Sequence, residues 1–183
     1  MNLLFLLLVV IPPPQIHCIL EVHSSTSLGH AVYLRGNRLL TVAHLQGEEG
    51  LSWSTPLLDG TASFLWKGRK RDLALYSINT PPPLCWVTIS KKKPVNGDEV
   101  YYKGYLDNYS PYWAKGMVLG YDSDGEIQVD GFLQGGVSGS GVLNEEGELV
   151  GIAVAGANWG PADSKIFYRS TLSVIPITED PKP

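Results

Sequence analysis

The chain has 183 residues, 44% of them hydrophobic, which predicts a packed core and excludes an intrinsically disordered protein. Its net charge of −4, from 14 basic and 18 acidic side chains, argues against general affinity for nucleic acid. With 20 glycines and 13 prolines and no long uninterrupted helical pattern, the sequence favours short strands separated by turns, and therefore an all-β fold.

The N-terminus carries nine consecutive apolar residues at positions 3–11. This stretch is too short to cross a bilayer, which takes about 20 residues, but it fits the hydrophobic part of a secretory signal. No basic side chain precedes it, and Pro12-Pro13-Pro14 follows in place of a cleavage site. We expect residues 1–17 to form a hydrophobic leader and the protein to be exported or membrane-associated; an uncleaved anchor or a buried first strand are the alternatives.

The two cysteines, Cys18 and Cys85, could form one disulfide in an exported protein, or could equally be two small core residues. Neither has the spacing of a metal site, and the sequence has no CxxC, HExxH or P-loop motif. No metal or other cofactor is therefore expected.

Residues 18–90 are predicted to form the first half of the fold. His44 follows an apolar run that could place its imidazole at a strand end, beside a cleft, and Asp72 opens an alternating strand. Asp59 is the rival acid, but Asp59-Gly60 is a strong turn signal that accounts for it. Strands are expected at 19–23, 30–35, 38–42, 62–66, 73–78 and near 85–89.

Residues 91–97 are predicted to link the halves, because their lysines, Pro94 and Gly97 all disfavour a strand interior. The second half is expected at 98–177, followed by a disordered tail at 178–183. Its predicted elements are strands at 98–103, 114–121, 125–131, 140–144, 148–155 and 165–169, and a short helical turn near 171–175.

A glycine-rich turn, Gly136-Val137-Ser138-Gly139-Ser140-Gly141, precedes the apolar run 148–154. Glycine lets the backbone aim several N–H groups at one point beside a hydroxyl, which is what acyl transfer needs. Most such turns are only hairpin tips, so the residues upstream decide between the two interpretations.

The order of the histidines and acids limits the triads that Ser138 could join. The four histidines, at 17, 23, 30 and 44, all precede Ser138, which excludes the order Ser, acid, His. The first aspartate, Asp59, follows every histidine, which excludes the order Asp, His, Ser. The order His, Asp, Ser remains, and His44 has the strongest context of the four.

Three segments together resemble the motifs of chymotrypsin-like (trypsin-fold) serine proteases: Thr41-Val42-Ala43-His44, Asp72-Leu73-Ala74-Leu75 and Gly136-Val137-Ser138-Gly139-Ser140. Their spacing is most similar to the high-temperature-requirement proteases of bacteria and to small viral and phage proteases. Gly29-His30-Ala31-Val32 resembles a family strand that carries serine or threonine where this chain has His30. The resemblance covers about residues 28 to 157 and implies two six-stranded antiparallel Greek-key barrels with the active site between them.

The same resemblance implies a serine endopeptidase that works through an acyl-enzyme. Ser138 would be the nucleophile, His44 the general base and Asp72 the acid that orients it, with the N–H groups of Gly136 and Ser138 as the oxyanion hole. Phe132 would lie at the pocket base, where a trypsin-type enzyme has an acid, so a small or hydrophobic P1 residue is expected. The substrate pocket would be walled by Phe132, Leu133, Gln134, Gly135, Val154, Ala155 and Gly156.

Two departures from the family pattern have consequences. Val137 replaces the aspartate that pairs with a new N-terminus in digestive proteases, so activation by that zymogen route is not expected. Gly141 replaces the usual proline, which predicts a looser turn. The rival nucleophile is Ser140, and the alternative functions are an inactive protease-fold binding protein and a viral protease restricted to its own polyprotein.

A nucleic-acid interpretation rests on a basic cluster, 67–71, and an aromatic run, 101–113. Single-strand binders interleave such residues along one groove, whereas these lie in different predicted halves. The expected partner is therefore a protein or peptide substrate and not nucleic acid.

Overall fold

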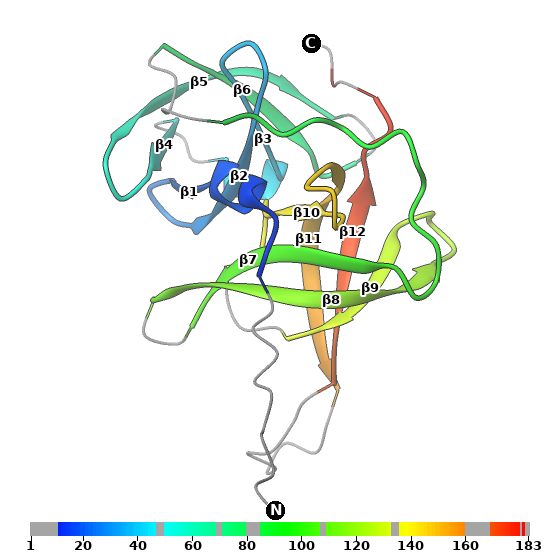
Figure 1. The fold of residues 1–183 in the computed structure, drawn as a ribbon. Helices are drawn as coiled ribbons and strands as arrows, with labels where there is room; N and C mark the ends of the chain where they lie inside the picture. The colour runs from blue at the N-terminus through cyan, green and yellow to red at the C-terminus, as the bar shows by residue number, and fades with distance from the viewer. Residues whose placement is uncertain are drawn as a thin grey trace, which may run out of the picture.

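The computed structural model describes residues 11–46, 50–68, 71–79, 85–106, 109–132, 136–159, 169–179 and 181, with the backbone alone for 155–159 and 169–170. Two closed antiparallel barrels of six strands each make up the fold, one above the other in Figure 1. This confirms the predicted all-β, two-barrel architecture.

The first barrel has the strand order β1-β2-β3-β6-β5-β4, in which β3 is followed by β6 and not by β4, a Greek-key crossover. Its buried side chains include Val32, Leu40, Trp53 and Leu75, each at most 1% exposed. The strands are β1 (Ile19–His23), β2 (Leu28–Leu34), β3 (Arg38–Thr41), β4 (Leu51–Ser54), β5 (Asp59–Lys67) and β6 (Ala74–Ile78).

The second barrel has the order β10-β11-β12-β9-β8-β7. Val100, Val118, Val129 and Val174 are completely buried in its core, as the alternation of apolar and polar residues requires. The strands are β7 (Glu99–Tyr105), β8 (Pro111–Tyr121), β9 (Ile127–Gly131), β10 (Gly141–Leu143), β11 (Leu149–Trp159) and β12 (Arg169–Pro176).

Three predicted elements were wrong. The expected turn at Asp59-Gly60 lies earlier, where the Thr55 N–H bonds the Leu58 carbonyl, so Asp59 begins β5 and a strand not predicted, β4, pairs with it. Residues 85–89 make only isolated bridges. The helical turn near 171–175 is part of β12, in which Leu172 and Val174 are buried and alternate with half-buried residues.

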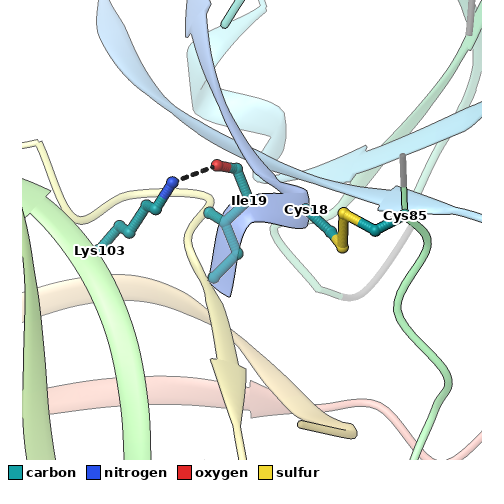
Figure 2. The surroundings of a disulfide bond; sticks show 4 residues. All are labelled: Cys18, Ile19, Cys85 and Lys103. Atoms are coloured by element: carbon teal, nitrogen blue, oxygen red, sulfur yellow. Dashed lines mark hydrogen bonds between the residues drawn. A yellow bond between two sulfur atoms is a disulfide. The ribbon is translucent and has the colours of Figure 1, made fainter. Parts of the chain in front are cut away.

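The segment before β1 is tied to the first barrel. Residues Pro14–Cys18 form a short 3₁₀ helix, η1, whose Ile16 is buried, so the end of the predicted leader is part of the fold, and residues 1–10 lie outside the described part. Cys18 and Cys85 are joined by a disulfide across 67 positions (Figure 2). Closing a loop of that length contributes about 4 kcal/mol in the chain-entropy account.

A side chain from the second barrel reaches the same place. Lys103 of β7 donates from Nζ to the Ile19 carbonyl at 2.9 Å (Figure 2), which links the second barrel to β1 of the first. At the other end of the chain, Arg38 donates to the Pro181 carbonyl, within the tail predicted to be disordered. Within the described residues, no helix combines the length and apolar character needed to cross a membrane.

Candidate active site

His44 and Asp72 lie next to each other because their strands are neighbours. His44 belongs to a 3₁₀ turn, η2 (Ala43–Leu45), directly after β3, and Asp72 precedes β6, which pairs with β3 through Thr41 and Ala74. The His44 Nδ1–H donates to Asp72 Oδ2 at 2.5 Å, and the His44 backbone N–H donates to Asp72 Oδ1 at 2.9 Å. Both carboxylate oxygens therefore hold one residue.

This contact fixes the state of the imidazole. A carboxylate only accepts, so the proton of His44 is on Nδ1, and Nε2 is left as an acceptor. The His44 and Asp72 side chains are 45% and 33% exposed, so the pair is only partly covered by the protein. The imidazole can accept a proton from a donor that contacts Nε2.

Ser138 lies in a tight turn that β11 supports. Gly139 has a φ of 80°, in the left-handed region, and its N–H donates to the Ala153 carbonyl at 2.8 Å. The Ser140 N–H closes the turn on the Val137 carbonyl at 2.9 Å. The Ser138 hydroxyl donates to the Val154 carbonyl at 3.2 Å, and His44 is not its partner.

The turn packs directly against the first barrel, on the side that carries His44. A Cβ added at Gly29 would lie 2.5 Å from a methyl of Leu45 and 2.7 Å from the Ser138 carbonyl oxygen. A Cβ at Gly139 would collide with the His30 carbonyl and the Thr41 hydroxyl. Only glycine at these two positions lets the Ser138 turn approach the segment 41–45 this closely.

His30, for which the sequence predicted no role in the site, makes two hydrogen bonds to this turn. Its backbone N–H donates to the Ser138 carbonyl at 2.9 Å, and its Nδ1–H donates to the Gly136 carbonyl at 2.8 Å. Desolvation by burial lowers the pKa of His30 to about 3, so the imidazole is neutral at ordinary pH. In the sequence, His30 was marked only by its place in Gly29-His30-Ala31-Val32, the segment that resembles a family strand.

The predicted substrate-pocket residues are described in part. Phe132, just after β9, is 52% exposed and packs edge-on against Tyr112 at 5.2 Å between ring centroids. Val154 provides the carbonyl that Ser138 bonds, while Ala155 and Gly156 continue β11 opposite Ser173 and Leu172. Leu133, Gln134 and Gly135 lie outside the described residues.

Two rivals fit their predicted roles poorly. Ser140 is completely buried, and its hydroxyl accepts from the Lys103 backbone N–H at 2.8 Å, so no substrate can reach it. Asp59 begins β5 opposite Ser54, whereas the carboxylate that bonds the His44 imidazole is that of Asp72. Ser138 and Asp72 are thus the better candidates on geometry.

The aromatic run at 101–113 is divided between core and surface. Tyr101, Tyr102 and Tyr105 are buried in the core, whereas Tyr109 and Trp113 are exposed. Across the described ranges, no group of three or more histidine, cysteine or acidic side chains could hold a metal ion.

Comparison with known families places most of the chain in a peptidase family. The family model described as "Trypsin-like peptidase domain" matches residues 29–152, a range that includes His44, Asp72 and Ser138. No curated protein sequence matches the chain.

Solved structures match the fold. A serine endoprotease from Yersinia pestis is 22% identical with a TM-score of 0.69, and the match covers 76% of this chain and 54% of that one. The active form of the Rv3671c protease from M. tuberculosis is 16% identical with a TM-score of 0.71, covering 88% and 77% of the two chains. The inactive form of that protease is 14% identical with a TM-score of 0.71, covering 87% and 84%. This chain therefore spans about half the length of the Yersinia chain.

Proposed function

The chain belongs to the trypsin-like peptidase family, and from that premise we propose that it is a serine endopeptidase acting through an acyl-enzyme. The observation that carries the proposal is the His44–Asp72 contact, because it leaves Nε2 of an exposed imidazole free to accept a proton beside the Ser138 turn. A histidine oriented in this way is the general base that a serine nucleophile needs.

In the proposed reaction, Nε2 of His44 takes the Ser138 hydroxyl proton as Oγ bonds the scissile carbonyl carbon. The resulting oxyanion accepts from the N–H groups of Ser138 and Gly136. His44 then returns the proton to the leaving amine as the C–N bond breaks, which leaves an acyl ester on Ser138. Water, deprotonated by the same Nε2, hydrolyses the ester and restores the hydroxyl. Asp72 holds the imidazole and stabilises its charged form throughout.

The hydroxyl of Ser138 must turn before it can react. It donates to the Val154 carbonyl, and moving to His44 gives up one neutral hydrogen bond, worth about 1 kcal/mol. Such bonds are often long in free enzymes and tighten with substrate. The same observation favours the second candidate, a protease-fold binding protein without activity, so the experiment must separate the two.

Wild-type, Ser138→Ala and Ser140→Ala proteins would test the proposal. Each is assayed for casein cleavage and for labelling by a fluorophosphonate probe. Wild type and Ser140→Ala should cleave casein and carry the probe on Ser138, and Ser138→Ala should do neither. Labelling of Ser140 would contradict the choice of nucleophile. A folded wild type that takes no probe would support the binding protein, while labelling without casein cleavage would support an enzyme restricted to its own polyprotein.

The proposed substrate is a polypeptide with a small or hydrophobic P1 residue, since Phe132 brings no charge that could bind lysine or arginine. A peptide library should show cleavage after such residues, and strong cleavage after arginine would contradict this. Export or membrane association is also proposed, because the Cys18–Cys85 disulfide suits an oxidising compartment.

A further inference from the structure

We propose that His30 is a positioning residue whose imidazole and backbone N–H hold the Ser138 turn in the shape that presents an oxyanion hole. The inference rests on the serine endopeptidase function proposed above and adds a residue outside its triad. His30 lies in β2, on the other barrel from Ser138, so the hole would be set by a contact between barrels.

Three successive carbonyls of the turn each accept a hydrogen bond. His30 donates from Nδ1 to the Gly136 carbonyl at 2.8 Å and from its backbone N–H to the Ser138 carbonyl at 2.9 Å. Between them, the Val137 carbonyl accepts from the Ser140 N–H at 2.9 Å. The peptide units on both sides of the one that carries the Ser138 N–H are thus anchored to His30.

These bonds also set the direction of the Ser138 N–H. The peptide bond is planar and trans, so the Ser138 N–H points opposite to the Val137 carbonyl. Because that carbonyl is bonded back into the turn, the N–H faces the other way, and no described residue accepts a hydrogen bond from it. An N–H group that is fixed and unpaired is what a developing oxyanion requires.

His30 itself is held by burial, by ring stacking and by a hydrogen bond to its carbonyl. It is completely buried, its ring stacks on Tyr105 at 4.7 Å, and its carbonyl accepts from the Thr41 hydroxyl at 2.6 Å. A carbonyl only accepts, so the Gly136 contact puts the proton on Nδ1, and the buried Nε2 has no hydrogen-bond partner among the described residues. Gly136 in turn lies against the Tyr105 ring, where a Cβ would collide. The turn therefore docks on a rigid His30–Tyr105 surface.

The imidazole and the backbone contribute separately, which makes the proposal testable by substitution. Any residue except proline at position 30 keeps the backbone bond to Ser138, whereas only a side chain with a donor at the place of Nδ1 keeps the bond to Gly136. The amide nitrogen of asparagine is separated from Cα by the same number of bonds as Nδ1, and that of glutamine is one bond farther. Leucine fills the site without a donor.

The experiment compares His30→Leu, His30→Asn and His30→Gln with wild type in fluorophosphonate labelling rate, kcat and KM on a peptide substrate. His30→Leu should lower the labelling rate and kcat by roughly 10- to 100-fold with KM unchanged, the size expected when a reacting group is displaced by about 1 Å. His30→Asn should recover most of the rate, and His30→Gln should not. A folded His30→Leu protein with wild-type rates, or equal rates for Asn and Gln, would overturn the proposal.

A measurement on the wild-type protein does not depend on activity. Nitrogen-15 NMR of His30 should find a neutral imidazole protonated on Nδ1 at pH 6, with a slowly exchanging proton. A charged ring or the Nε2–H tautomer would overturn the proposal even if the leucine variant failed to fold. If wild type took no probe while NMR gave the expected tautomer, the endopeptidase function would fail and the His30 contact would stand as structure without catalysis.

Discussion

At the scale of single residues, the two oxygens of Asp72 have separate partners. Oδ1 accepts from the His44 backbone N–H, and Oδ2 accepts from the imidazole Nδ1–H. The carboxylate thus fixes where His44 sits with one oxygen and which tautomer it adopts with the other. A neutral amide can satisfy only the first of these contacts.

Asp72→Asn should therefore be folded and nearly inactive. Its amide oxygen would keep the backbone bond while its NH₂ faced Nδ1, which would move the ring proton to Nε2 and remove the base. The expected loss in kcat is about 10⁴-fold, or roughly 5.5 kcal/mol. Asp59→Asn, at an exposed position in β5, is the matched control and should keep its activity. Loss of activity in the control alone, measured on the same peptide, would refute the assignment of the acid.

Some of the site could be predicted from the sequence, because each predicted residue carries its own local context. His44 follows an apolar strand, Asp72 opens one, and Ser138 is enclosed by glycines. His30 has no such context, since its contacts with Gly136 and Ser138 span more than 100 positions and exist only after two barrels meet. Neither spacing nor composition records which buried histidine faces a turn so far along the chain.

At the scale of elements, β2 and the Ser138 turn depend on a glycine that permits their approach. Gly139 has a left-handed φ, and its α-carbon faces the His30 carbonyl and the Thr41 hydroxyl without space for a methyl group. The backbone of β2 cannot retreat easily, because the Thr41 hydroxyl and the β3 ladder hold it. The turn would have to give way instead.

Gly139→Ala should consequently lower both activity and stability. The left-handed φ alone costs about 1–2 kcal/mol for a residue with a Cβ, and the collision should also displace the turn, with kcat reduced by roughly 10²-fold. Gly125→Ala is the matched control, because Gly125 has a φ of 77° but nothing within 4 Å of an added Cβ. Thermal unfolding should show a similar loss of stability from the left-handed φ in both variants. The value of kcat should fall only in Gly139→Ala. Equal kcat values in the two variants would contradict the close approach.

Element prediction failed where segments were short or alternated weakly. In β4 only Leu51 and Trp53 are buried, which is too few residues for a pattern of period two to stand out. In β12, serine and threonine alternate with apolar residues. This alternation reflects burial of one face of a barrel strand and not the periodicity of a helix. The longer alternating strands of both barrels were predictable because each repeats the pattern several times.

At the scale of the whole molecule, burial of His30 makes stability depend on pH. The folded pKa is about 3, lowered mainly by desolvation and further by Lys103 and His23, whereas the unfolded value is about 6.5. As pH falls below 6.5 the unfolded chain takes up a proton that the folded chain refuses, so this stability is present at neutral pH and lost in acid.

The free energy of unfolding should therefore decrease by roughly 3 kcal/mol between pH 7 and pH 4 on account of His30 alone. Urea unfolding at several pH values measures it. His30→Asn, which does not titrate in this range, is the reference that removes the contributions of the other histidines and the carboxylates. Parallel curves for the two proteins would show that His30 is not buried in its neutral form.

The division of the site between the barrels also bears on how the protein is made. A ribosome completes β1 to β6 before it reaches residue 99, and N-terminal units generally fold first during synthesis. The first barrel can therefore form, with His44 already held by Asp72, while the Ser138 turn does not yet exist. Under the proposed function, hydrolytic power would appear only when the last strands dock that turn on His30. A truncated product, from a cleaved mRNA or a stalled ribosome, would therefore have no proteolytic activity in the cell that makes it.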